Sequence, residues 1–316
     1  MTDRIPEIIV LLGPTAVGKT AVSIPLARSL DAEIISADSR QIYVGMDIGT
    51  AKPSHSERGA ARHHLIDVVD PASDFTVADF MKLSFEKIEE IQKRGKRVLV
   101  VGGTGLYIRA LIDRPSYQNQ PPVPELREEL LEEITEKGPE ALYEELKRFD
   151  PDAAEKIHPN NTPRLIRAIE IIRTTGHRFS DAVKRDSERA KEFPEYEWKL
   201  IELVADRDRL YERINMRVVK MIHSGWVDEV RRLLESGCCG DEKPLQGLGY
   251  RDIVAHIRGE KSLDAAIELA QRDTRRFAKR QLTFFRGFDD VTRIELSSDF
   301  DPNEISARIL ELFGIV

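Results

Sequence analysis

The stretch Gly13-Pro14-Thr15-Ala16-Val17-Gly18-Lys19-Thr20 decides the fold of this 316-residue chain. Its glycines let the backbone curl so that successive amides point inward, and a helix that follows would place its positive end at the same point. Such a P-loop fits a diphosphate: Lys19 supplies a mobile cation, and the Thr20 hydroxyl suits a magnesium ligand. We therefore predict that residues 13–20 bind pyrophosphate and that Thr20 contributes to a Mg²⁺ site.

Short apolar runs lie on both sides of this loop. Ile8 to Leu12 precedes it as a predicted strand, and Thr20 to Leu30 follows it as a predicted helix. Further strands are expected at 33–37, 65–69, 97–101 and 198–204. Because these runs are continuous rather than alternating, they predict a parallel sheet covered by helices on both faces, an α/β fold. Such sheets bind ligands beyond the carboxyl ends of their strands.

A proline-rich stretch, Pro115 to Pro124, interrupts this pattern. Charged amphipathic helices are expected after it, at 125–135, 140–149 and 162–174. The strand-like pattern returns near Trp198, and the tail from Arg207 onward is expected to be mostly helical. We therefore predict a P-loop core formed by residues 1–120 and 198–316, with a helical insertion domain at 121–197.

The charges of the chain are unevenly distributed. The net charge is −7, but Val123 to His158 alone holds twelve acidic against five basic residues, a balance of −7. From Arg272 to Arg286 there are six basic residues and one aspartate. A basic strip therefore exists inside an acidic protein, and the net charge does not exclude a nucleic-acid partner.

Composition excludes several classes of protein. The two cysteines, Cys238 and Cys239, are adjacent and cannot form a disulfide framework or a zinc knuckle. No apolar run approaches the roughly 20 residues that cross a bilayer, and Met1 to Glu7 lacks the layout of a signal peptide. We expect a cytoplasmic protein that does not bind a membrane.

A P-loop by itself is also typical of nucleoside triphosphatases and small-molecule kinases. These need a carboxylate at a strand end, and Asp67, Asp70 and Asp206 each follow an apolar run. The predicted strand 97–101 ends instead in Gly102-Gly103-Thr104-Gly105, without an acid. The missing acid argues against a standard triphosphatase. A non-catalytic RNA-binding module would explain the basic strip but would leave the P-loop without a role. A P-loop kinase with the insertion as its lid remains the alternative.

Several further motifs narrow the choice. In these segments, and in their order, the chain resembles the tRNA isopentenyl transferase family: Gly13–Thr20, Ala37–Tyr43, Gly45–Pro53, His63–Asp67, Gly102–Tyr107, Arg213–Arg217, Gln246–Arg251 and Thr274–Gln281. The resemblance covers nearly the whole chain. It departs at Phe75, where the family pattern has tyrosine, which puts one hydroxyl contact in doubt.

The resemblance implies transfer of a dimethylallyl group from dimethylallyl pyrophosphate to N6 of an adenosine next to the anticodon, position 37. Adenine's amine is a poor nucleophile, so a base that removes its proton is valuable, and Asp38 is the expected base. The resemblance also implies that Thr104 lies over the reacting centre and that Arg217 stabilises the departing pyrophosphate. Read from the residues alone, Asp38 and Thr104 could be turn residues, and Arg217 could form a surface ion pair with Glu212.

The target adenine must leave its stack in the anticodon loop to react. The resemblance implies that the partners are dimethylallyl pyrophosphate and a tRNA anticodon stem-loop, and we expect the protein to be a monomer. The resemblance and the basic strip predict these tRNA contacts: Asp38, Ser39, Arg40, Gln41, Pro163, Arg164, Leu165, Ile166, Arg167, Gln246, Gly247, Leu248, Gly249, Tyr250, Arg251, Thr274, Arg275, Arg276, Lys279 and Arg280. The alternative for the last group is a solvated basic helix face whose aromatic residues lie in the core.

Overall fold

The computed structural model describes residues 6–113, 123–189 and 193–314. The chain divides into two compact units, one formed by residues 1–112 and 195–316 and the other by residues 113–194. The sequence analysis placed these boundaries at 120/121 and 197/198. Most of the proline-rich stretch behind the first boundary, residues 115–122, lies outside the described residues.

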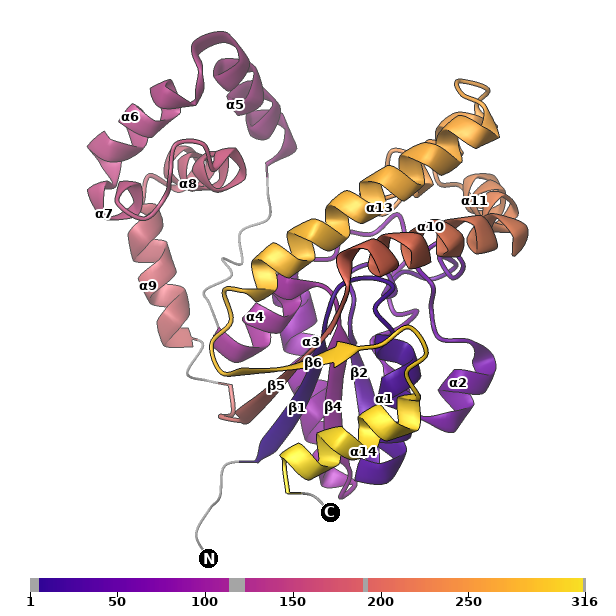
Figure 1. Ribbon diagram of the computed structural model, residues 1–316. Coiled ribbons are helices and arrows are strands. Elements are labelled where there is room, and N and C mark those ends of the chain that lie inside the picture. Colours follow the sequence, from indigo (N-terminus) through magenta and orange to yellow (C-terminus); the bar gives the residue numbers. More distant parts are fainter. Residues whose placement is uncertain (1–5, 114–122, 190–192, 315–316) are drawn as a thin grey trace, which may run out of the picture. The chain divides into compact units, whose positions relative to one another are not determined.

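A six-stranded sheet forms the centre of the first unit (Figure 1). All its pairings are parallel, and the strand order is β3-β2-β4-β1-β5-β6. The strands are β1 (Glu7–Leu12), β2 (Ala32–Ala37), β3 (His63–His64), β4 (Arg97–Gly102), β5 (Glu197–Ala205) and β6 (Val291–Leu296). The predicted α/β fold class is confirmed, with β1 and the loop after it at the middle of the sheet.

Two strand predictions were wrong. The expected strand 65–69 is not formed, and the strand β3 ends just before it at His64. Leu65 and Asp67 have φ of 60° and 57°, in the left-handed region, which is incompatible with the extended backbone of a strand. The chain bends there, and Val69 forms a single bridge with Tyr43. The strand β6 was missed in the tail; it pairs with β5 on one side only, and most of its residues are not buried.

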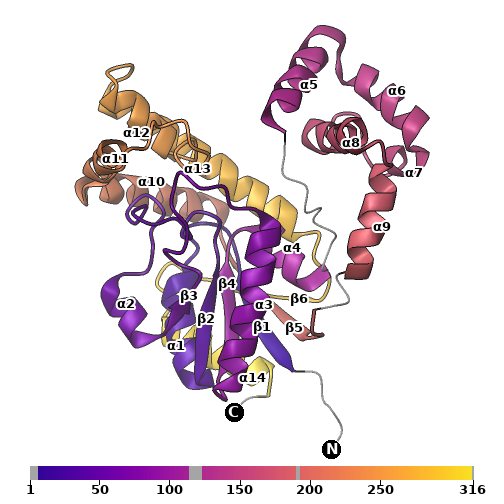
Figure 2. The same ribbon diagram turned by 180° about the vertical axis from the view of Figure 1, so that it is seen from behind.

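Helices cover both faces of the sheet (Figures 1 and 2). On one face, α1 (Lys19–Leu30) packs against α14 (Pro302–Leu312). On the other lie α3 (Val77–Lys93) and α4 (Gly105–Asp113). The short α2 (His55–Ala60) follows the long loop after β2. Buried apolar residues of α1, β1 and β5, among them Leu26, Leu11 and Leu203, share one core.

Four helices follow β5: α10 (Arg207–His223), α11 (Trp226–Glu235), α12 (Tyr250–Ile257) and α13 (Leu263–Phe285). The helices α10 and α13 lie side by side across the carboxyl ends of the strands (Figure 1). A second apolar cluster joins α11 and α12 to the loop after β2 through Ile42, Met46, Trp226 and Tyr250. The C-terminal helices therefore contact the edge of the sheet at which the P-loop opens.

The second unit is helical, as predicted. It contains α5 (Pro124–Lys137), α6 (Pro139–Phe149), α7 (Pro151–Ala154), α8 (Thr162–Thr175) and α9 (Phe179–Arg189). Its own core includes Leu130, Leu142, Leu146 and Leu165. Asp150 is fully buried and hydrogen-bonded: one oxygen caps α7 and both accept from Ser180.

Candidate active site

The P-loop connects β1 to α1 at the carboxyl edge of the sheet. Gly18 has φ of 120°, and a Cβ at Gly13 would lie 2.6 Å from the carbonyl oxygen of Leu203, so the loop needs glycine at both positions. The Lys19 ammonium donates to the carbonyls of Gly13 and Pro14, each at 2.8 Å. Burial lowers the pKa of Lys19 to about 8, partly offset by the Asp38 carboxylate and reinforced by Arg217.

The Thr20 hydroxyl stands at the start of α1 and makes no hydrogen bond to another described residue. Mg²⁺ commonly takes one or two protein oxygens and completes its shell with phosphate oxygens and water. No cluster of three or more His, Cys, Asp or Glu side chains suited to a metal occurs in the described part of the chain. Thr20 therefore fits a cation that binds together with a diphosphate.

The glycine-rich turn after β4 contacts both the P-loop and the segment that follows β2. A Cβ at Gly103 would lie 3.4 Å from the Lys19 ammonium, which places this turn beside the P-loop. The Thr104 hydroxyl accepts the Ser39 backbone N–H at 2.9 Å. Thr104 is therefore a turn residue that contacts Ser39, the residue after Asp38, and its place over the reacting centre stays a prediction.

Gln281 of α13 completes this junction. Its side-chain oxygen accepts the Thr15 N–H at 2.9 Å, and its nitrogen donates to the Gly103 carbonyl at 2.8 Å. Gln281 was not among the predicted site residues, although it ends the motif 274–281. Its position became apparent only once α13 was seen to cross the sheet edge.

Asp38 follows the last residue of β2. One carboxylate oxygen accepts the N–H groups of Arg40 at 2.9 Å and Gln41 at 3.4 Å, the turn role that the residues alone suggested. The second oxygen has no hydrogen bond from another described residue. The carboxylate also acts electrostatically on both Lys19 and Arg217. One oxygen thus holds the turn while the other is available to a ligand.

Arg217 lies on α10 and forms no ion pair or hydrogen bond with another described residue, so the surface ion pair with Glu212 is not observed. Burial lowers the pKa of Arg217, Asp38 opposes this shift and Arg213 adds to it. Arg213 was not predicted as a site residue. Its guanidinium lies 5.6 Å from the Phe300 ring centre and near Gly18 of the P-loop.

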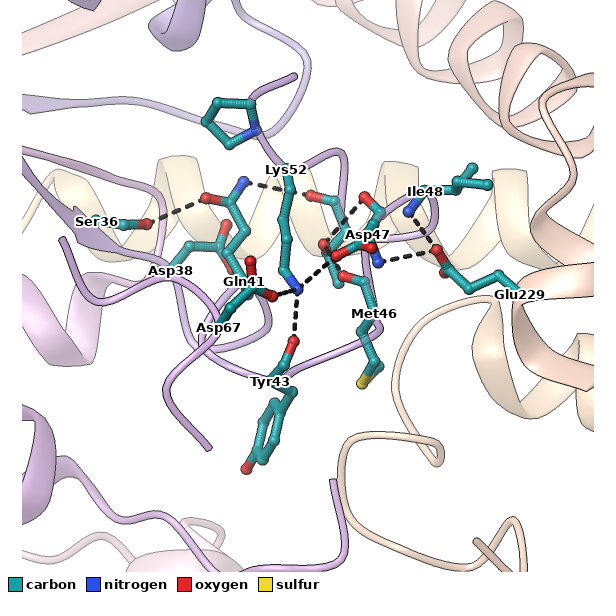
Figure 3. Close-up of polar contacts among 12 residues, drawn as sticks. Ser36, Asp38, Gln41, Tyr43, Met46, Asp47, Ile48, Lys52, Asp67 and Glu229 are labelled. Atoms are coloured by element: carbon teal, nitrogen blue, oxygen red, sulfur yellow. Dashed lines mark hydrogen bonds and ion pairs between the residues drawn. The ribbon is translucent and has the colours of Figure 1, made fainter. Parts of the chain in front are cut away.

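The residues after Asp38 are engaged within the protein (Figure 3). The Gln41 side-chain oxygen accepts the Ser36 hydroxyl at 3.1 Å, and its nitrogen donates to the carbonyls of Thr50 and Ala51. Arg40 donates to the Lys243 carbonyl at 3.0 Å. Gln41 therefore braces a loop, whereas it was predicted as a tRNA contact.

The predicted segment Gln246–Arg251 divides by burial. Gln246 and Arg251 are exposed, Leu248 is half-buried, and Gly247, Gly249 and Tyr250 are buried. Tyr250 packs edge-on against Trp226 and is 2% exposed, so its predicted contact with tRNA is corrected to a core role. A hollow of about 370 Å³ brings this segment together with α13; it is lined by Gln246, Arg251, Asp252, Arg258, Lys261 and Arg272, among others.

On α13 most of the predicted basic residues face outward. Arg276, Lys279 and Arg280 are exposed, and Lys279 and Arg280 form no ion pair with a described residue. Arg275 instead donates to the Asn215 side chain, and the Thr274 hydroxyl to the Ala270 carbonyl. Of the neighbouring aromatics, Phe285 is core and Phe284 is 38% exposed.

On α8 the predicted tRNA contacts have different surroundings. Leu165 and Ile166 are 0% and 7% exposed and belong to the core of the insertion, so their predicted contacts are corrected to packing. They occupy the apolar face of an amphipathic helix. Arg167 forms an ion pair with Glu170 at 2.6 Å. Pro163 and Arg164 are exposed.

The model of the family described as IPP transferase matches residues 41–288. The chain belongs to the IPP transferase family. It is 46% identical over 307 residues to a tRNA dimethylallyltransferase of Acetivibrio thermocellus, covering 97% of both chains, and 45% identical over 301 residues to that of Bacillus subtilis, covering 95% and 94%. These matches give no support to the kinase alternative.

Solved IPP transferase structures share the fold. A full-length tRNA isopentenylpyrophosphate transferase from Bacillus halodurans has a TM-score of 0.70 at 39% identity, covering 98% of this chain and 97% of that one. A eukaryotic dimethylallyltransferase described as acting on tRNA has a TM-score of 0.76 at 27% identity, covering 98% of this chain and 79% of that one.

Among the described residues, none of the helices has the length and apolar character needed to cross a bilayer.

Proposed function

We propose that this protein transfers a dimethylallyl group from dimethylallyl pyrophosphate to N6 of adenosine 37 in tRNA and releases pyrophosphate. Membership of the IPP transferase family supports the reaction class. The observation that carries the proposal is the electrostatic interaction of Lys19, Asp38 and Arg217, from three separate segments. The turn Gly103–Thr104 lies beside Lys19 and binds the residue that follows Asp38, at the carboxyl edge of the sheet.

The chemistry follows from this arrangement. N6 attacks the allylic carbon, the carbon–oxygen bond breaks, and pyrophosphate leaves with the bonding electrons. The free oxygen of Asp38 takes the proton from N6, while the P-loop amides, Lys19 and Arg217 stabilise the growing charge of the leaving group. When bound, Mg²⁺ would supply further charge neutralisation through the Thr20 hydroxyl.

For tRNA, we propose that the exposed residues of α13 and of the hollow beside it contact phosphates. Lys279, Arg280 and Arg276 are exposed on α13, and Arg251 and Arg272 line the hollow. Phosphate contacts of this kind position an RNA without reading its sequence. The anticodon stem-loop as the bound part, a monomeric state and a cytoplasmic location remain predictions.

The test is incubation with labelled dimethylallyl pyrophosphate, Mg²⁺ and unmodified tRNA, followed by mapping of the modified nucleotide. Pyrophosphate release should match label in tRNA one to one, and a tRNA carrying guanosine at position 37 serves as the control. Absence of label under every metal condition would falsify the proposal. Label at another nucleotide would overturn the assignment of position 37.

A further inference from the structure

We propose that Glu229 is a positioning residue for this reaction, whose carboxylate occupies a cradle of backbone amides and holds the loop that begins at Asp38. The inference rests on the proposed function. It concerns a buried charge on α11 that has no part in the chemistry described above.

The cradle is formed by three consecutive N–H groups of that loop, and those of Asp47 and Ile48 can be followed in Figure 3. The Glu229 carboxylate accepts from Asp47 at 2.9 Å, from Ile48 at 2.6 Å and from Gly49 at 3.2 Å. A fourth hydrogen bond, at 2.7 Å, comes from the Tyr250 hydroxyl. Glu229 is 2% exposed, so its charge is satisfied almost entirely by these donors.

The buried Glu229 carboxylate and the backbone N–H groups of the cradle stabilise the protein only when both are present. A buried carboxylate is costly unless it is hydrogen-bonded, and three backbone donors would lose their acceptor if it were removed. Glu229 also lies in the first turns of α11, where the positive end of the helix favours an anion. The backbone geometry resembles that of loops that bind phosphate, with a protein carboxylate in place of the ligand.

The cradle is linked to Asp38 through the same loop. Lys52 is bonded to the Tyr43 carbonyl and to the carboxylates of Asp47 and Asp67, which ties the end of the loop to its middle. Gln41 then connects Thr50 and Ala51 to Ser36 in β2.

The last link reaches the proposed base. The Gln41 N–H donates to the Asp38 oxygen that closes the turn. A shift of residues 47–49 would therefore be passed through Gln41 to the carboxylate, and misplacement of a catalytic group by about 1 Å can cost on the order of a hundredfold in rate.

The cradle also connects the loop to α12. Gly49 packs so closely on Trp226 that a Cβ there would lie 2.1 Å from the indole nitrogen. Burial, together with Glu229, raises the pKa of Tyr250 well above its usual value, so the hydroxyl remains a donor. Tyr250 adjoins Arg251, one of the exposed residues proposed to contact tRNA.

The first test replaces Glu229 by glutamine, which keeps the size and removes the charge. We expect kcat at saturating substrates to fall about tenfold or more, with tRNA affinity within about twofold of wild type. Hydrogen exchange of the amides of residues 47–49 should accelerate. The matched control is Glu235→Gln, an exposed glutamate of the same helix, which should leave both measurements unchanged.

The second test asks whether Glu229 acts through Asp38. In an Asp38→Asn background, Glu229→Gln should cause little further loss of kcat, because the group that it positions is already absent. A purely structural role predicts instead that the two losses multiply. Tyr250→Phe removes one of the four hydrogen bonds and should lower kcat by about two- to threefold even if Glu229→Gln folds poorly.

The outcomes separate the two proposals. If the wild-type protein is active and Glu229→Gln has the same kcat, the positioning role is overturned. Losses of kcat that multiply in the double variant would overturn it as well. An inactive wild-type protein would count against the proposed function instead.

Discussion

Two arginines on different helices show how the same side chain can serve two purposes. Arg217 on α10 has no ion pair with a described residue, and burial lowers its pKa. Arg173 on α8 forms ion pairs with Glu145 at 2.6 Å and Glu133 at 3.1 Å, and the hydrogen bond that it donates to Glu145 raises its pKa. A partly buried cation without a partner is costly in the free protein and is stabilised when an anion binds. This contrast supports our proposal that Arg217 binds an anionic ligand, whereas the ion pairs of Arg173 stabilise the insertion.

The largest expected effect comes from Asp38, whose carboxylate interacts electrostatically with Arg217. Asp38→Asn keeps the oxygen that closes the turn but loses the base, so turnover should fall by about 10²–10⁴-fold with tRNA affinity retained. Asp70→Asn is the control, because Asp70 accepts the Ala72 N–H at 2.8 Å in a similar turn. Weakened tRNA binding with normal turnover would contradict the assignment of Asp38 as base.

Arg217 itself should rank second. Arg217→Met removes the cation that we propose stabilises the leaving group, and we expect kcat to fall by about 10²–10³-fold. Thermal stability should not fall, since Arg217 has no ion pair to lose with a described residue and the cost of burying its charge outweighs its attraction to Asp38. Lys220→Gln, exposed on the same helix, provides the comparison. If the variant had a normal rate and reduced stability, Arg217 would have a structural role like that of Arg173.

The third prediction concerns pH. The pKa of Lys19 is lowered to about 8, so its charge is complete below that pH and is lost as the pH rises through it. Binding of an anionic pyrophosphate needs the charged form, so kcat/KM for dimethylallyl pyrophosphate should fall up to about tenfold per pH unit above 8. A profile that stays flat to pH 10 would refute this assignment.

A smaller effect is expected on α13. Lys279→Gln with Arg280→Gln removes two exposed, unpaired charges, so tRNA affinity should drop several-fold and the dependence of affinity on salt should decrease by about one unit per residue. Affinity would be measured across salt concentrations, with Lys93→Gln as a comparison, because Lys93 of α3 is paired with Glu89 at 2.8 Å and is not among the proposed tRNA contacts. An unchanged salt dependence would favour a merely solvated basic face.

The smallest effect on activity is expected at the paired arginine. Arg173→Gln should leave kcat and tRNA affinity within about twofold and should lower stability by roughly 1 kcal/mol, because Glu145 loses its arginine and Glu133 keeps only its ion pair with Lys137. Chemical denaturation would measure this change. A large loss of tRNA affinity without a loss of stability would show that Arg173 leaves its ion pairs to bind RNA. Arg173 and Arg217 would then both bind a ligand, and the contrast between them would not hold.

Much of this protein was determined by local sequence. The P-loop needs an apolar strand, glycines that permit a tight backbone and a helix start, all within about 25 residues, so it could be predicted with its parallel sheet. The amphipathic helices of the insertion follow from periodicity in the same way. The predictions for Leu165–Ile166 and for residues 65–69 failed because a motif or an apolar run does not reveal which side chains are buried or where the backbone bends.

Only the tertiary structure decided which distant groups meet and which charges remain unpaired. Glu229 is 180 or more residues from the amides that it accepts, and Gln281 is 266 residues from Thr15. Whether an arginine is neutralised depends on the carboxylates that folding brings within about 4 Å, a distance that is not encoded by spacing along the chain. That is the physical reason why Arg217 and Arg173 look alike in sequence and differ in the folded protein.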